Sequence, residues 1–451
     1  MALNPVLDII LAKIQVCITM VTLTGTHLPI SMDKPERKLP VDLSIIGRIQ
    51  QYRDSYPSQF WLLFWGSLVN FTGMSMIWPF LVIYLGNELN LPLSVITTLT
   101  SINAVASLIS SFLAGSIADK LGRKWTMVIS LSMTGFTLAA MVPAHTYTQF
   151  AILMALRGSF RPLYRVGSDA MIADLVPPEK RADAFALTRL VKNVGVALGP
   201  ALGGFMIASS YKITFGIASG TTIFFGILIA LFTLETLPDA AREMQEKLHE
   251  NIKSYLAIFK DRIFSSFILG FTLRQIAGSI LWVLLGVHTI ENFGLSESLF
   301  GLIPTTNAVM VVLLQLFVTR RTSRFPPLAV MAVGTLFYGL GVGSIAFATG
   351  FWGFLTSMVI VTIGELMVIP TASTYTANRA PETMRGRYMS MLAITMGAGS
   401  MVGPLLGGFL NDAFSPSAIW YGGGAAGFLG AIIFYFLATK TRKSGAEVPA
   451  K

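Results

Sequence analysis

Twelve apolar stretches of about 20 residues constrain this chain more than any other feature of its sequence. A stretch of that length forms a helix that crosses the roughly 30 Å hydrocarbon core of a bilayer. Backbone groups in lipid must be hydrogen-bonded within the span, and the alternating pattern of barrel strands is absent, so we predict helices. The expected spans are 60–85, 95–118, 125–143, 147–173, 184–208, 214–235, 263–288, 298–319, 327–349, 352–377, 386–410 and 417–438.

Composition excludes the main alternatives to a membrane protein. Of the 451 residues, 53% are hydrophobic and 12% are charged, whereas soluble domains are about 25% charged. A disulfide scaffold is excluded because Cys17 is the single cysteine. The sequence therefore predicts an all-α polytopic membrane protein with twelve transmembrane helices.

The distribution of basic residues predicts the topology. Most of the 33 Lys and Arg residues lie in loops and flanks on one side of the predicted membrane, whereas the opposite loops contain only Lys212. Because basic loops stay in the cytoplasm, we expect a multi-pass protein of the plasma (inner) membrane with both ends of the twelve-span body cytoplasmic. The net charge of +10 forms a girdle and not a patch on one face, which argues against a nucleic-acid partner.

The spans divide the chain into two halves with a charged connection. Residues 1–31 are apolar but contain Asp8 and Lys13 and lack the basic n-region of a secretory signal, which favours an upstream extension or interfacial segment over a thirteenth helix. The expected segments are an N-terminal extension at 1–57, a first six-helix bundle at 58–235, a cytoplasmic linker at 236–262, a second six-helix bundle at 263–440 and a cytoplasmic tail at 441–451.

An internal repeat relates the two halves. The stretch GVALGPALGG aligns without a gap, at an offset of 204 residues, with GSMVGPLLGG. Parallel repeats are how many secondary transporters build a site near the bilayer midplane. Small residues also let helices approach closely, so either helix packing or a role in shaping the pore explains the run. Its Gly and Pro positions are Gly195, Gly199, Pro200, Gly203 and Gly204 in the first half and Gly399, Gly403, Pro404, Gly407 and Gly408 in the second.

The loop between the second and third spans reads GSIADKLGRK. It resembles the signature of the major facilitator superfamily, whose members have twelve helices in two pseudo-symmetric six-helix bundles, and the resemblance covers about 58–440. It implies a cytoplasmic clamp in which Asp119 and Arg123 lock the outward-facing state, with Asp174 or Asp169 as the third member. The equivalent loop of the second half keeps basic residues but lacks the Gly and Asp. The implied clamp residues are Gly115, Asp119, Gly122, Arg123, Lys124 and Asp174.

The Gly-Pro run of the first half is similar to the antiporter motif of the drug:proton exporters within this superfamily. The resemblance implies export by antiport. A second copy of the run is unusual for those exporters, so the run is expected to be partly architectural.

Ionisable residues within the spans are the candidates for proton coupling, because each costs on the order of 3 kcal/mol at mid-bilayer. Glu365 is the only acidic residue deep in the second half, and burial favours its neutral form, so we expect it to carry the proton. A static ion pair with Arg274 or with an arginine of the fourth span is the alternative.

The fourth span contains Arg157, Arg161, Arg165 and Asp169, which recur every four residues and share one broad helix face. Arg157 matches the family's span-four arginine pattern associated with proton coupling, whereas Arg165 is as well explained by snorkelling to the interface. The expected proton-coupling residues are Glu365, Arg157, Arg161 and Asp169.

Other polar and aromatic residues within the spans are candidates for lining a substrate cavity. The excess of arginine over acidic residues suits anionic or zwitterionic substrates better than lipophilic cations. The candidates are Asn70, Trp78, Arg189, Asn193, Arg274, Gln275 and Trp282.

Other chemistries have no motif in the sequence. The chain contains no P-loop, no His or Cys spacing for a metal and no G-x-S-x-G pattern. We therefore expect a monomeric transporter and not an enzyme, driven by the proton gradient without a cofactor, that exports small amphipathic compounds across the lipid bilayer. Proton-coupled uptake, or sugar or metabolite export by the same fold, is the alternative; a transport-inactive sensor is a third.

Overall fold

The computed structural model describes residues 56–237, 261–381 and 384–443. The fold is that of the described residues within the unit Tyr56–Lys451. The expected N-terminal extension, most of the linker and the end of the tail lie outside the described residues. Within the described ranges the long elements are all helices, and no strand occurs.

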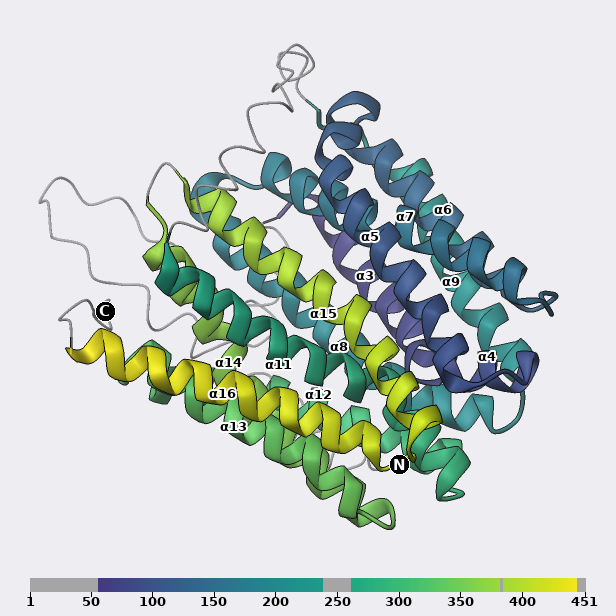
Figure 1. Ribbon diagram of the computed structural model, residues 1–451. Coiled ribbons are helices and arrows are strands. Elements are labelled where there is room, and N and C mark those ends of the chain that lie inside the picture. Colours follow the sequence, from purple (N-terminus) through teal and green to yellow (C-terminus); the bar gives the residue numbers. More distant parts are fainter. Residues whose placement is uncertain (1–55, 238–260, 382–383, 444–451) are drawn as a thin grey trace, which may run out of the picture. The chain divides into compact units, whose positions relative to one another are not determined.

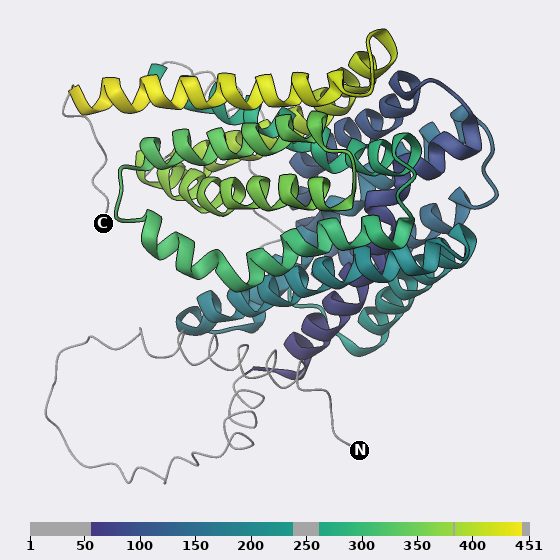
Figure 2. The same ribbon diagram turned by 90° about the horizontal axis from the view of Figure 1, so that it is seen from below.

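Two series of six membrane helices follow one another in the chain, coloured purple to teal and then green to yellow in Figure 1 and, from below, in Figure 2. The first series is α3 (Ser58–Ile77), continued through a 3-10 turn (Trp78–Phe80) into α4 (Leu81–Leu89), then α5 (Leu93–Leu121), α6 (Arg123–Met141), α7 (Tyr147–Leu175), α8 (Arg181–Ile207) and α9 (Tyr211–Phe232). The second is α11 (Arg262–Val287), continued by a π turn (His288–Asn292), α12 (Glu297–Thr322), α13 (Pro327–Ser344), α14 (Phe351–Arg379), α15 (Arg385–Ala413) and α16 (Ala418–Lys443).

The repeat of 204 residues extends well beyond the Gly-Pro run. Adding 204 to the first residue of α5, α6, α7 and α8 (93, 123, 147 and 181) gives the first residue of α12, α13, α14 and α15 (297, 327, 351 and 385). Helices α7 and α14 also end at equivalent residues, Leu175 and Arg379. The two halves are therefore related without a gap over these helices, which confirms the two pseudo-symmetric bundles.

Ten segments of the described chain are long and apolar enough to cross a membrane by length and composition. The remaining two long helices are α6, which begins with Arg123 and Lys124, and α7, which contains three arginines and two aspartates. Together they make the twelve helices of the predicted fold. The charges of α7 are thus an exception to the apolar composition of its neighbours.

The glycines of the repeated run pack helices together within each half. A Cβ atom added at Gly195 would lie 3.0 Å from the Leu68 carbonyl oxygen of α3. In the second half, a Cβ atom at Gly399 would lie 2.8 Å from the carbonyl carbon of Gln275 in α11. Gly199 and Gly203 face α3 in the same way, and Gly403 and Gly407 face α11. The run is therefore a packing face in both halves.

The two halves contact each other near one end of the bundles, through the pairs α5 with α15 and α8 with α12. This end, which carries the loop after α4, is called the opposite end; the end where α5 meets α6 is called the basic end. The Ser94 N–H donates to Asp412 Oδ2 over 2.8 Å, and the Ser101 hydroxyl donates to the Met401 carbonyl over 2.8 Å. Between α8 and α12, the Thr305 hydroxyl donates to the Ala197 carbonyl over 3.0 Å.

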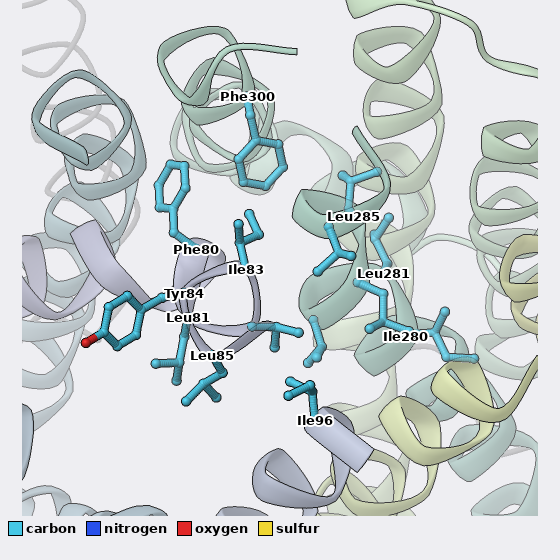
Figure 3. Packing of buried hydrophobic residues seen from close by; sticks show 14 of the residues in the cluster. Phe80, Leu81, Ile83, Tyr84, Leu85, Ile96, Ile280, Leu281, Leu285 and Phe300 are labelled. Carbon is cyan, nitrogen blue, oxygen red and sulfur yellow. The ribbon is translucent and has the colours of Figure 1, made fainter. Parts of the chain in front are cut away.

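Apolar side chains from both halves fill the interface at the opposite end. Phe80 and Ile83 of the first half lie toward Phe300, Leu281 and their neighbours in the second (Figure 3). The Phe80 and Phe300 rings meet edge to face with centroids 5.3 Å apart. We call this buried cluster the plug; burial of so much apolar surface holds this end closed.

Candidate functional site

The predicted clamp residues meet at the basic end of the first half. Arg123, at the start of α6, forms an ion pair with Asp119 of α5, and its Nε lies 3.6 Å from Asp174 Oδ2 at the end of α7. The Thr236 hydroxyl donates to the same Asp174 oxygen over 3.1 Å. Of the two candidates for the third member of the clamp, Asp174, and not Asp169, thus lies beside Arg123.

Glu235, which was not predicted, caps α6 within this cluster. Its carboxylate accepts hydrogen bonds from the backbone N–H groups of Arg123, over 2.8 Å, and Lys124, over 3.1 Å. A carboxylate satisfies N–H groups that have no partner within a helix and suits the positive end of its dipole. Gly122 directly precedes α6 and has a φ of 91°, a backbone conformation that favours glycine. The signal in the sequence was an acidic residue directly after the sixth span.

Among the described residues, the ion pairs and hydrogen bonds of Asp119, Arg123 and Asp174 all lie within the first half. Half of the Asp119 side chain is exposed, at 53%. A Cβ atom added at Gly115 would meet no heavy atom within 4 Å, whereas one at Gly397, further along the interface, would lie 3.1 Å from Leu108. The contacts between α5 and α15 therefore give way to open space toward the basic end.

The second half has a different ion pair at the basic end. Arg379, the last residue of α14, donates from Nε and Nη2 to both carboxylate oxygens of Asp261 over 2.9 and 3.0 Å. Asp261 also accepts from the backbone N–H groups of Ile263 and Phe264 and so caps α11. Partial burial raises the pKa of Asp261, but the hydrogen bonds from Arg379 and from the two N–H groups outweigh it, so the net pKa lies below its usual value.

Two arginines of α7 share one aromatic partner. The guanidinium carbons of Arg157 and Arg161 lie 5.7 and 5.9 Å from the centre of the Trp78 ring, within the range of cation–π attraction. Arg157 is buried, at 1% exposure, and its Nε and Nη1 have no hydrogen-bond partner. Arg161, one turn further on, is exposed.

Asp169 pairs within the first half and does not join the two arginines. Its Oδ1 lies 3.7 Å from the Lys192 ammonium of α8. Arg165 and Arg189 are both exposed. Arg157, Arg161, Arg165 and Asp169 of α7 thus differ in environment although they lie on one broad face.

Glu365 of α14 is held by an amide. Asn307 of α12 donates from Nδ2 to Glu365 Oε2 over 2.9 Å and to the Thr362 hydroxyl over 2.9 Å. Among the described residues, no basic side chain forms an ion pair with Glu365. The expected alternative, a direct pair with Arg274, is therefore not formed here. Asn307 was missed, although an amide within an apolar span is a recognisable signal.

Arg274 lies instead on an aromatic ring of the same half. Its guanidinium carbon is 4.0 Å from the centre of the Tyr338 ring, and its Nη1 donates to Gln275. Of the other cavity candidates, Asn70 is buried with an unpartnered Oδ1, Asn193 is half-buried and Trp282 packs against the plug.

The offset of 204 residues places these polar groups in equivalent pairs. Trp78 corresponds to Trp282 and Asn103 to Asn307. Asn103 donates to the Met154 carbonyl of α7 over 2.9 Å, as Asn307 donates to α14. Arg161 corresponds to Glu365. The same position is thus cationic in one half and acidic in the other.

This architecture, two repeated six-helix bundles with ionisable side chains between them, defines a membrane transporter and not an enzyme. The family model described as Major Facilitator Superfamily matches residues 63–276 and 267–450, and the chain belongs to that superfamily. It is a multi-pass membrane protein whose family moves small molecules.

Several relatives extend over most of the chain. It is 27% identical, over 78% of its length and 88% of the relative, to a Na(+), Li(+), K(+)/H(+) antiporter of Planococcus maritimus. It is 23% identical, over 80% of its length and 92% of the relative, to the quinolone resistance protein NorA of Staphylococcus aureus (strain MSSA476). The crystal structure of the nucleoside transporter NupG has the same fold, with a TM-score of 0.70 at 14% identity, over 84% of this chain and 99% of that one.

Proposed function

We propose that this protein is a proton-coupled antiporter that exports small amphipathic compounds by alternating access. The environment of Glu365 carries the proposal. Its carboxylate is half-buried and is held by the Asn307 amide, not by a cation. A carboxyl group without a counter-ion takes up and releases a proton without first breaking an ion pair, and a polar residue in a membrane helix is functional by default.

The conformation supports alternating access. The halves meet at the plug and separate toward the basic end. If the basic loops face the cytoplasm, this conformation is inward-facing, and the clamp is assembled within the first half, ready to meet the second half when the basic end closes. The relatives support antiport and export, since one is a cation/proton antiporter and another a quinolone resistance protein.

Everted membrane vesicles test the proposal. A pH gradient is formed, amphipathic compounds are added one at a time, and proton efflux is followed with a pH-sensitive dye. The full chain should dissipate the gradient for at least one compound, and Glu365→Gln should abolish this response. Glu291→Gln, which alters an exposed carboxylate near the opposite end, is the matched control and should respond normally. Proton release by Glu365→Gln at the wild-type rate would remove Glu365 as the carrier.

The cation/proton antiporter of Planococcus maritimus favours a second candidate, exchange of monovalent cations for protons. The same vesicles distinguish the two. Addition of sodium, lithium or potassium chloride dissipates the gradient only if cations are substrates. The cationic side chains Arg157, Arg161 and Arg189 argue against an inorganic cation in the same space, so we favour organic compounds.

A further inference from the structure

The first polar layer beyond the plug contains the two arginines of α7. Met154 of α7 is wholly buried in the plug. Arg157 follows after one turn and Arg161 after another, and both lie against Trp78, which packs on the plug from the 3-10 turn after α3. The apolar seal at the opposite end is therefore bordered by two guanidinium groups on one indole ring.

The guanidinium groups of Arg157 and Arg161 have no acidic partner among the described residues, unlike three other cations of the chain. Arg123, Arg379 and Lys192 each lie within 4 Å of a carboxylate. No such pair includes Arg157 or Arg161, and two nitrogen atoms of the buried Arg157, Nε and Nη1, have no acceptor. Cation–π attraction offsets only part of the cost of burying a charge. A buried, unpartnered guanidinium is a binding site for an oxyanion, which accepts its hydrogen bonds and compensates its charge.

The equivalent layer of the second half has the opposite charge. Glu365, the counterpart of Arg161 in the repeat, is held by a neutral amide and has no cation within ion-pair distance among the described residues. The nearby Arg274 lies on the face of Tyr338. The first half therefore presents two guanidinium groups without an ion pair. The second half presents the Glu365 carboxylate, which also forms none although the buried Arg274 belongs to the same half.

We propose that the substrate is zwitterionic, with its carboxylate bound by Arg157 and Arg161 beside Trp78 and its ammonium group bound by Glu365. This inference rests on the proposed function and names the substrate class of the same site. A carboxylate matches the fork of donors on a guanidinium, and an ammonium group matches a carboxylate that lacks a counter-ion.

The arrangement also explains why exchange with a proton has the sign of antiport. Protonation of Glu365 removes the charge that attracts the ammonium group, so proton and substrate compete. A purely anionic substrate would be favoured by the same protonation, because the neighbouring negative charge disappears, and would move together with the proton. Antiport at Glu365 therefore requires a positive charge on the substrate, whereas Arg157 and Arg161 require a negative one.

Thermal unfolding of the full chain in detergent tests the inference with three matched probes at equal ionic strength. Benzoate carries only the anion, benzylammonium only the cation, and para-(aminomethyl)benzoate both. A ligand that binds the folded state raises the unfolding temperature. We expect the zwitterion to stabilise most. Arg161→Gln should weaken zwitterion and benzoate binding roughly tenfold and leave benzylammonium binding unchanged. Glu365→Gln should weaken only the two probes that contain the ammonium group.

Arg165→Gln is the control, because it removes an exposed arginine one turn further along α7 that has no contact with Trp78. The inference would be overturned if the zwitterion stabilised the protein no more than benzylammonium does, or if neither carboxylate probe stabilised it. Equal effects of Arg161→Gln and Arg165→Gln would overturn it as well. The vesicle assay tests the proposed function independently of this binding test. If the probes bind as their charges predict but no proton exchange occurs in vesicles, the proposed function is contradicted and the substrate class assigned here is not.

Discussion

The carboxylate of Glu235, just after the last helix of the first half, accepts a hydrogen bond of 2.8 Å from the backbone N–H of Arg123. This contact joins the two residues over 112 positions of the chain. Because residue 235 begins the connection to the second half, the start of that connection is fixed to the clamp.

Removal of this cap should destabilise the first half. Glu235→Ala leaves the N–H groups of Arg123 and Lys124 without an acceptor, and we expect a loss of about 1–2 kcal/mol. Thermal unfolding in detergent measures the change. Asp183→Ala is the matched control, because Asp183 is an exposed carboxylate in the first turn of α8 with no such hydrogen bond among those described. Equal losses in the two variants would contradict the capping role.

Gly115→Ala should separate folding from transport. The added methyl group meets nothing within 4 Å in this conformation, and alanine is the better helix former by about 0.5–1 kcal/mol, so the unfolding temperature should stay constant or rise. Transport in vesicles should fall if the basic end closes over Gly115 in the other state. Normal transport by Gly115→Ala would show that no close approach occurs there.

Gly408→Ala should open the opposite end. A Cβ atom at this position would lie 2.8 Å from Ser94 Cα in the other half, so contact between α15 and α5 becomes strained by about 1–3 kcal/mol. Labelling of Ser101→Cys by a thiol reagent, in a Cys17→Ser background, reports the change, because Ser101 is buried in that interface. We expect labelling to accelerate several-fold. Gly220→Ala, where an added Cβ meets nothing within 4 Å, should label at the original rate.

The ion pair of Asp261 and Arg379 predicts a pH dependence of stability. The pKa of Asp261 in the folded protein is depressed below its usual value. The group therefore contributes stability above the unfolded pKa, near pH 4, and loses it as the pH falls through the folded pKa. Asp261→Asn should unfold at a lower temperature than wild type at neutral pH, with a difference that shrinks below about pH 4. If the difference in unfolding temperature did not depend on pH, the lost hydrogen bonds to the N-terminus of α11 alone would explain it.

Much of the fold could be predicted from the sequence because lipid imposes length and hydrogen bonding on each span. The fourth span was expected at 147–173 and α7 is Tyr147–Leu175. Ten residues of the Gly-Pro run gave the offset of 204, and the helices of both halves follow it. Helix ends were missed where polar residues continue a helix beyond lipid, as at Asp119 in α5.

The contacts of the site could be predicted less well, because they join residues that are distant in sequence. Asn307 and Glu365 are 58 residues apart, and Asp261 and Arg379 are 118 apart. Local patterns identify each residue as polar in an apolar setting but not its partner. The correspondence of Arg161 with Glu365 was available from the repeat, and its meaning depended on knowing that neither has an opposite charge beside it.

Matched helix lengths have a mechanical consequence. Helices α7 and α14 both contain 29 residues, and α6 and α13 contain 19 and 18. Two bundles of equal height call for the same hydrocarbon thickness around their perimeter. When one tilts against the other, the surrounding lipid is stretched or compressed little on either side, so the membrane opposes the motion with only a small elastic force.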